Sequence, residues 1–195
     1  RVSRIAYHPS GRFLATCCFD YSWRLWDLNQ LKEVLHQEGH SREVYHVAFH
    51  PDGSLAGTCG LDARGLVWDL RTGQCVMPLD GHLQKVLAID FAPNGYHIAT
   101  GSEDQKVMIW DLRKRKSIYT IPAHTNLISF VKFHDNYLLS GSYDCKVKVW
   151  THPGWIPLKT LAGHEQKVSC VDISPDGQYI ASSSFDRTFK LWSTE

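Results

Sequence analysis

An acidic residue placed six positions before a tryptophan recurs five times, and this repeat constrains the fold more than any other feature of the sequence. The pairs are Asp20 and Trp26, Asp62 and Trp68, Asp104 and Trp110, Asp144 and Trp150, and Asp186 and Trp192. Successive acids are separated by 42, 42, 40 and 42 residues. A regular period of about forty residues is typical of stacked supersecondary units. The chain is therefore better described by counting repeats than by counting domains.

The pattern inside each repeat predicts four short strands. The first strand carries apolar residues at intervals of three and then two, as at Val44, Val47 and Phe49, which breaks strict alternation and predicts a β-bulge. Turn sequences such as HPDG follow, in which proline and glycine favour a hairpin. A strand of small apolar residues, the aspartate turn, a strand ending at the tryptophan and a more polar strand complete the unit. Four strands per repeat indicate an all-β fold, the blade of a β-propeller.

Five repeats account for the whole chain, with expected boundaries at 1–38, 39–80, 81–122, 123–162 and 163–195. The fourth repeat lacks the proline-glycine turn, so its first hairpin should be tighter. The last repeat ends just after its third strand, and the first begins inside the pattern. We therefore expect a propeller truncated at the N-terminus.

The third, fourth and fifth repeats gather the same polar side chains. His82, Ser102, Asp104 and Trp110 could form a chain of hydrogen bonds from indole through hydroxyl and imidazole to carboxylate. The equivalent sets are His124, Ser142, Asp144 and Trp150, and His164, Ser184, Asp186 and Trp192. Gly60 and Cys18 replace the hydroxyl in the second and first repeats, which we therefore expect to be less well supported. Because an active site occurs once per domain, this repetition favours a structural network over nucleophilic catalysis.

Composition excludes several other classes of function. The formal net charge is +1, so no global field draws the chain to nucleic acid. The six cysteines show no C-x-x-C spacing, and no zincin motif, phosphate-binding glycine loop or G-x-S-x-G elbow occurs. We therefore expect that the protein is not an enzyme, has no catalytic residue, and binds no metal, no cofactor and no small-molecule substrate. With no sequon, signal peptide or membrane-length apolar run, a cytosolic or nuclear protein with no membrane partner is expected.

Glycine-histidine and tryptophan-aspartate pairs recur at the two ends of the repeats. They are Gly39-His40, Gly81-His82 and Gly163-His164, with Trp26-Asp27, Trp68-Asp69 and Trp110-Asp111. By these marks the chain resembles the WD40-repeat family, which implies part of a seven-bladed propeller with about two blades absent, and a binding platform rather than a catalyst.

Two segments that a propeller does not demand resemble one group within that family. THPGW at 151–155 and PNGYHIATG at 93–101 are similar to the WD-repeat splicing factors of the U4/U6 small nuclear ribonucleoprotein (snRNP). This resemblance implies a non-enzymatic nuclear scaffold of the U4/U6 particle and of the U4/U6.U5 tri-snRNP. Such a scaffold supports pre-mRNA splicing by docking partner proteins, in proximity to U4/U6 RNA.

Candidate contact residues follow from the geometry of a propeller. The residue before each turn acid faces one surface, where we expect a partner-binding site formed by Phe19, Tyr143 and Phe185 with Arg42, Lys85 and Lys167. The alternative is that each ring packs on the next blade.

A single basic run on the opposite face could contact RNA phosphate or be a solvated turn; it comprises Arg113, Lys114, Arg115 and Lys116. Trp155, in the corresponding turn of the next repeat, could plug its own blade or stay exposed.

The alternative function is a substrate receptor of a cullin-type ubiquitin ligase. It is based on the W-D-x-R pattern at Trp68–Arg71 and Trp110–Arg113, a weak motif.

Overall fold

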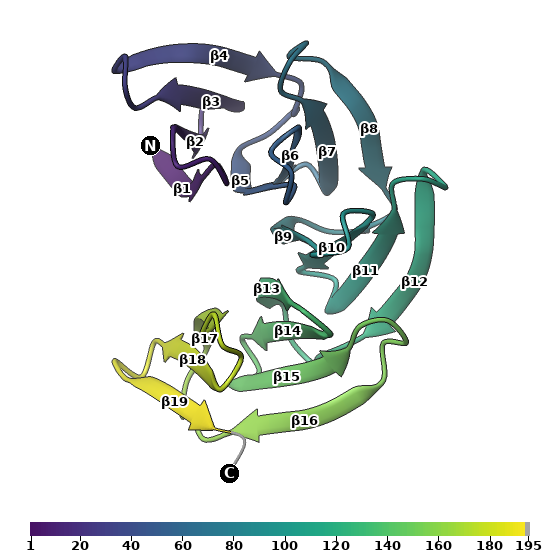
Figure 1. The fold of residues 1–195 in the computed structure, drawn as a ribbon. Coiled ribbons are helices and arrows are strands. Elements are labelled where there is room, and N and C mark those ends of the chain that lie inside the picture. Colours follow the sequence, from purple (N-terminus) through teal and green to yellow (C-terminus); the bar gives the residue numbers. More distant parts are fainter. Residues whose placement is uncertain (194–195) are drawn as a thin grey trace.

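The computed structural model describes residues 1–193, which form five antiparallel sheets arranged as an arc (Figure 1). Four sheets have four strands and the last has three. The strands are β1 Val2–Tyr7, β2 Phe13–Cys18, β3 Ser22–Asp27 and β4 Lys32–Glu38; β5 Val44–Phe49, β6 Leu55–Gly60, β7 Arg64–Asp69 and β8 Cys75–Asp80; β9 Val86–Phe91, β10 His97–Ser102, β11 Lys106–Asp111 and β12 Lys116–Pro122; β13 Ile128–His134, β14 Tyr137–Ser142, β15 Lys146–Thr151 and β16 Pro157–Ala162; and β17 Val168–Ile173, β18 Tyr179–Ser184 and β19 Phe189–Ser193. The all-β propeller fold is confirmed.

Every first strand carries the bulge that the sequence predicts. In the second sheet the register against β6 shifts between Val44 and His46, and the other four sheets shift at the corresponding place. The bulge allows Val44 and Val47 both to be buried, although strict alternation would send residues three apart to opposite faces.

The core lies between neighbouring sheets rather than inside any one of them. Buried clusters join the first sheet to the second, the second to the third, the third to the fourth and the fourth to the fifth. The small residues of the second strands permit this close packing. A Cβ added to Gly57 would lie 2.9 Å from the ring of Phe91 on the next sheet. This close packing of small residues positions each sheet against its neighbour.

The expected irregularities of the last two repeats are also present. Only Asp135 and Asn136 separate β13 from β14, so the first hairpin of the fourth repeat is the tighter one. The fifth sheet has three strands within the described residues.

On the concave side of the arc, the first and fourth sheets are in contact. The guanidinium of Arg4 in β1 lies 4.9 Å from the ring centroid of Phe130 in β13.

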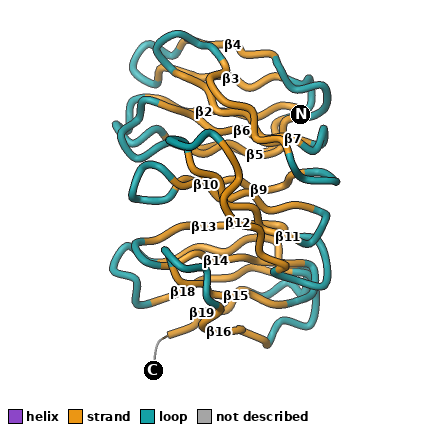
Figure 2. Tube along the Cα trace, turned by 90° about the vertical axis from the view of Figure 1, so that its right-hand side faces the viewer, coloured by secondary structure: helices purple, strands orange, loops and turns teal. Residues whose placement is uncertain are grey.

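The turns gather on two faces of the arc, which Figure 2 shows as loops on either side of the stacked strands. We call one the upper face; it carries the turns between the second and third strands and the connections between sheets. The lower face carries the two other turns of each sheet. No helix among residues 1–193 is long and apolar enough to cross a membrane.

Candidate functional site

A buried hydrogen-bond relay links the upper face to the interior of the second, third, fourth and fifth blades. In the third sheet His82 Nδ1 lies 2.8 Å from Asp104 Oδ2, and His82 Nε2 lies 2.8 Å from the hydroxyl of Thr100. Trp110 Nε1 donates to the same hydroxyl at 2.8 Å. Because the indole can only donate, the hydroxyl is free to donate to Nε2, which leaves Nδ1–H to donate to the carboxylate. The aspartate turn is thus tied to the third strand through a histidine from the preceding connection.

The hydroxyl of this relay is not the one expected from the sequence. Ser102, Ser142 and Ser184 were assigned to it, and that assignment is wrong; Thr100, Ser140 and Ser182 fill the role. The reason is strand register. Trp110 pairs with Ile98, so its diagonal neighbour on the same face is Thr100. A residue two positions further along the strand is beyond the reach of the indole.

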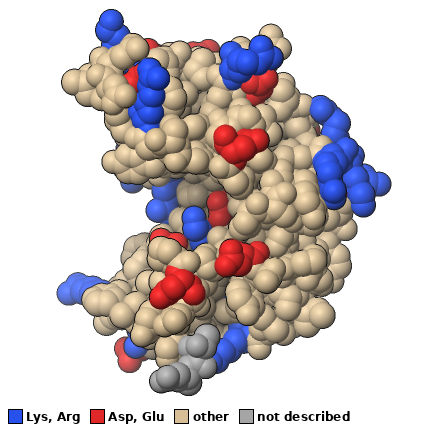
Figure 3. All heavy atoms as spheres, viewed as in Figure 1, with Lys and Arg blue, Asp and Glu red and all other residues tan. Residues whose placement is uncertain are grey.

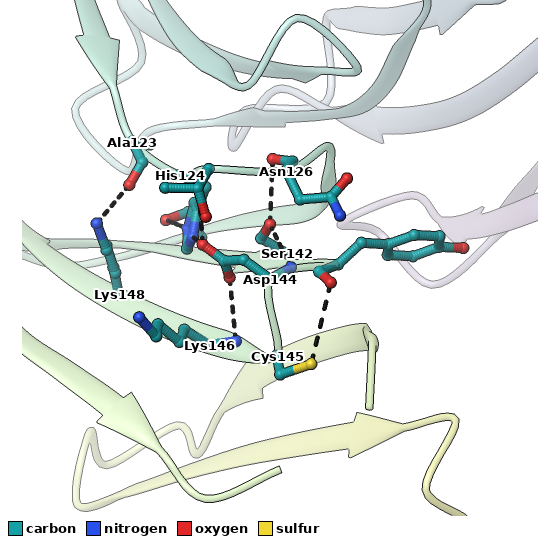
Figure 4. A network of polar contacts seen from close by, with 12 residues as sticks. Ala123, His124, Asn126, Ser142, Asp144, Cys145, Lys146 and Lys148 are labelled. Carbon is teal, nitrogen blue, oxygen red and sulfur yellow. Dashed lines mark hydrogen bonds and ion pairs between the residues drawn. The ribbon is translucent and has the colours of Figure 1, made fainter. Parts of the chain in front are cut away.

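The serines assigned to the relay have a different function, which Figure 4 shows in the fourth sheet. Ser142 Oγ donates to the backbone carbonyls of Asn126 and Leu127 and accepts from the amide of Asp144. Asp144 accepts from His124 and from the amide of Lys146. These serines fasten the sheet-to-sheet connection to the turn, beside the relay rather than within it.

The first two repeats nevertheless keep the relay hydroxyl, although Gly60 and Cys18 cannot form the hydroxyl bonds to the connection that Ser102, Ser142 and Ser184 form. Thr58 supplies the hydroxyl of the second repeat, at 2.9 Å from His40 and 2.8 Å from Trp68. Thr16 accepts from Trp26 in the first repeat, where the carboxylate of Asp20 is held by Ser22 and Arg24 instead of a histidine.

Electrostatics keep the turn carboxylates ionised. Burial by itself would raise the pKa of Asp62, Asp104 and Asp144, but hydrogen bonds from the histidines and backbone amides hold the pKa of each below its ordinary value. For Asp186 the Thr188 hydroxyl is the largest contribution to a lowered pKa. Each carboxylate is therefore a fixed acceptor that orders its turn.

The upper face carries one aromatic cluster. The rings of Tyr143 and Phe185 meet edge to face with centroids 5.9 Å apart, and Lys167 Nζ lies 4.9 Å from the centroid of Tyr143. Phe185 is 54% exposed. The two rings therefore pack against each other across neighbouring blades and still present apolar surface. Phe19 is separate from them, under the guanidinium of Arg1 at 4.9 Å.

The other predicted upper-face cations line a shallow groove between the second and third sheets. Lys85 forms an ion pair with Glu103 at 3.3 Å, whereas Arg42 contacts Glu43 at 3.8 Å and remains mostly exposed. Leu83 also lines this groove and is 80% exposed. Sequence reasoning missed Leu83, although a leucine directly after Gly-His stands where other repeats have Ser41, Thr125 and Glu165.

The basic run lies on the lower face, in the turn between β11 and β12, where Figure 3 shows Lys and Arg side chains gathered at the outer edge. Arg113 pairs with Asp111 at 3.0 Å and stacks on Tyr96 with its guanidinium carbon 3.6 Å from the ring centroid. The hydrogen bond from Arg113 lowers the pKa of Asp111 to about 2. Arg115 donates to the carbonyl of Val76. Lys114 and Lys116 form no ion pair within residues 1–193.

Trp155 resolves one alternative that the sequence left open. It is only 8% exposed and belongs to the apolar cluster between the third and fourth sheets. Its ring lies 5.6 Å from that of His97 on the third sheet and 5.1 Å from that of His152. The tryptophan is therefore a plug between blades rather than an exposed anchor.

Comparison with known proteins agrees with this architecture. The profile of the WD40 family (WD domain, G-beta repeat) matches residues 1–27, 31–69, 73–111, 115–151 and 155–193. The chain belongs to the WD40-repeat family.

Among curated relatives, the chain is 55% identical over 198 residues to the U4/U6 small nuclear ribonucleoprotein PRP4 of Saccharomyces cerevisiae. The aligned region covers 98% of this chain and 43% of that protein. It is 65% identical over 62 residues to U4/U6 small nuclear ribonucleoprotein Prp4 of Mus musculus, covering 32% of this chain and 12% of that protein. A DDB1- and CUL4-associated factor 11 homolog of Caenorhabditis briggsae is 36% identical over 72 residues, covering 34% of this chain and 13% of that protein. The chain spans less than half the length of each of these relatives.

Proposed function

We propose that the protein is a non-enzymatic scaffold of the U4/U6 snRNP and of the tri-snRNP that this particle forms with U5, and that it acts in the nucleus. The observation that carries the proposal is the 55% identity to yeast PRP4, because that similarity runs along 98% of the chain and is not confined to the repeat signatures. In this role the protein supports pre-mRNA splicing by holding other particle proteins in place.

The upper face is the proposed docking surface. Tyr143, Phe185 and Lys167 combine exposed aromatic area with a cation, the residue types that are enriched in binding hot spots. The relay supports this surface because it ties each aspartate turn to a buried tryptophan. Phe19, Arg42 and Lys85 extend the surface over the first three sheets.

A non-catalytic role agrees with the state of the polar side chains. In the relay the hydroxyl of Ser140 accepts from Trp150 and is bonded to His124, and the residue is fully buried, so the hydroxyl is out of reach of a substrate. The same arrangement recurs in other blades, as a structural network does.

RNA proximity is proposed for the basic turn on the lower face. Lys114 and Lys116 are exposed and unpaired within residues 1–193, and a lysine of this kind binds phosphate without reading sequence. Arg113 and Arg115 are partly engaged by Asp111 and Val76, so they shape the turn as well as add charge.

A second candidate is a substrate receptor of a cullin-type ubiquitin ligase, favoured by the short match to the C. briggsae factor. It is the weaker candidate, because the match covers 34% of the chain. Arg71→Ala and Arg113→Ala should abolish adaptor binding if the receptor hypothesis is correct, and should leave association with the snRNP intact if it is wrong.

The docking surface is tested by pull-down from nuclear extract with the full-length protein carrying Phe19→Ala, Tyr143→Ala and Phe185→Ala together. We expect recovery of U4/U6 snRNP proteins to fall strongly. Tyr119→Ala is the matched control, because Tyr119 is a half-exposed aromatic residue on the outer strand β12, away from the upper face. Recovery by the triple variant at the wild-type level would remove the upper face from the proposal.

A further inference from the structure

One position of the lower face has the same backbone conformation in four sheets and a different side chain in each. It is the fifth residue after the repeat tryptophan, in the turn between the third and fourth strands. These residues are Leu31, Gly73, Arg115 and Trp155, with φ of 52°, 72°, 53° and 58°. The tryptophan pairs with the seventh residue after it in all four sheets, so the four turns are equivalent.

From this position a long side chain reaches back to the preceding sheet. Arg115, in the third sheet, donates to the carbonyl of Val76 in β8 of the second sheet. Trp155, in the fourth sheet, inserts its indole beside His97 of β10 in the third sheet and is 8% exposed. The chain therefore uses this position to close the lower groove between neighbouring blades.

Gly73 leaves the corresponding groove between the first and second sheets open. The position points the same way, since a Cβ added there would meet two residues of β4 in the preceding sheet, with Nε2 of Gln37 at 2.6 Å and Cδ2 of Leu35 at 3.5 Å. A groove of about 860 Å³ remains between these two sheets, and Asp69, Leu70 and Arg71 line it from the second sheet. Its apolar walls are Phe13, Leu25, Val34, Leu35, Leu55 and Leu70.

The rim of this groove carries two groups that suit an indole. Asp69 forms no ion pair within residues 1–193, whereas its equivalents Asp27 and Asp111 pair with arginines. A carboxylate at the rim can accept an indole N–H. Arg71 is the equivalent of Arg113, which stacks on Tyr96 at 3.6 Å in the next blade. A guanidinium here can cover an inserted ring in the same way.

We propose that this groove between the first and second sheets binds an extended segment of a partner protein that inserts a tryptophan side chain, as Trp155 fills the equivalent groove within the chain. The site is separate from the upper face, and the proposal does not depend on the assignment to the U4/U6 particle. The chain itself cannot supply the occupant from Trp155, because that side chain is already buried.

The test uses a fluorescently labelled peptide with the sequence of residues 151–157, THPGWIP, and measures its anisotropy with the full-length protein. We expect saturable binding, and a loss of at least roughly tenfold in affinity when alanine replaces tryptophan in the peptide. Gly73→Trp, which fills the groove from within, should abolish binding. Gly73→Ala is the matched control because it imposes the same backbone strain and displaces only the flexible end of Gln37, without filling the groove. It should bind like the wild type.

Val34→Asp provides a second way to block the site, because it places a charge on the apolar wall at a residue that is 42% exposed and tolerant of change. No binding up to roughly 1 mM peptide would overturn the proposal, as would equal affinity of the wild type and Gly73→Trp. Sedimentation of the protein without peptide measures whether the chain associates with itself through this groove. A monomer–dimer equilibrium abolished by Gly73→Trp would assign the groove to a second copy of the chain and also overturn the proposal.

Discussion

Replacing Thr100 by valine tests the relay most sharply, because the change removes a hydroxyl and keeps the shape of the side chain. In the structure this hydroxyl serves both Trp110 Nε1 and His82 Nε2 at 2.8 Å. Trp110 is 2% exposed and the side chain of His82 is fully buried, so water cannot replace the lost partner. A buried polar group left without a partner costs about 1–3 kcal/mol, and two such groups lead us to expect a loss of about 2–4 kcal/mol.

The comparison that carries the test is with Ser102→Ala. That hydroxyl is buried, but it bonds the carbonyl of Gln84 and the amide of Asp104, which belong to an exposed and a half-buried residue. Its removal should cost only about 1 kcal/mol, the net contribution of an ordinary hydrogen bond. Thr100→Ser should recover most of the stability lost in Thr100→Val.

The assay is urea unfolding of the purified protein and its three variants, followed by tryptophan fluorescence, with the slope against urea compared to exclude a change in the unfolded state. We expect the midpoint to fall in the order wild type, Ser102→Ala, Thr100→Val. If Ser102→Ala costs as much as Thr100→Val, the relay does not run through Thr100 and our reasoning is refuted.

Three further predictions follow from other parts of the structure. The folded-state pKa values of Asp62, Asp104 and Asp144 are lowered, so the stabilisation that these carboxylates contribute is complete above the unfolded pKa of about 3.9 and is lost as pH falls through the folded values. Urea unfolding measured at a series of acidic pH values should show this loss, and Asp104→Asn should make the free energy of unfolding depend less on pH. Gly57→Val should cost about 1–3 kcal/mol in the same urea assay by forcing a side chain against Phe91, and a neutral result would contradict the close packing of the sheets. Lys114→Glu with Lys116→Glu should reduce ultraviolet crosslinking to U4/U6 RNA without changing the unfolding midpoint; unchanged crosslinking would leave the turn as a solvated one.

The repeat, the strands and the bulges were predictable because they depend on residues close together in sequence. The interval of three between Val44 and Val47 indicates a bulge, and both side chains are buried as that requires. The missing proline-glycine turn likewise predicted the short hairpin at Asp135 and Asn136.

The predictions that were wrong or left open depend on distances between strands or between sheets. Ser102 was assigned to the relay from the repeat pattern, yet the register of β10 on β11 brings Thr100 to the indole. The burial of Trp155 is set by His97 on another sheet, which local sequence does not reveal. Aligning the fifth residue after each tryptophan could have singled out Gly73 as the position without a plug.

The central claim, membership of the U4/U6 particle, is tested most directly by recovering the tagged full-length protein from nuclear extract and measuring the RNA that accompanies it. We predict that U4 and U6 RNA are enriched together over an unrelated small nuclear RNA such as U1. Recovery of a cullin adaptor with no enrichment of U4 or U6 RNA would contradict the proposed function.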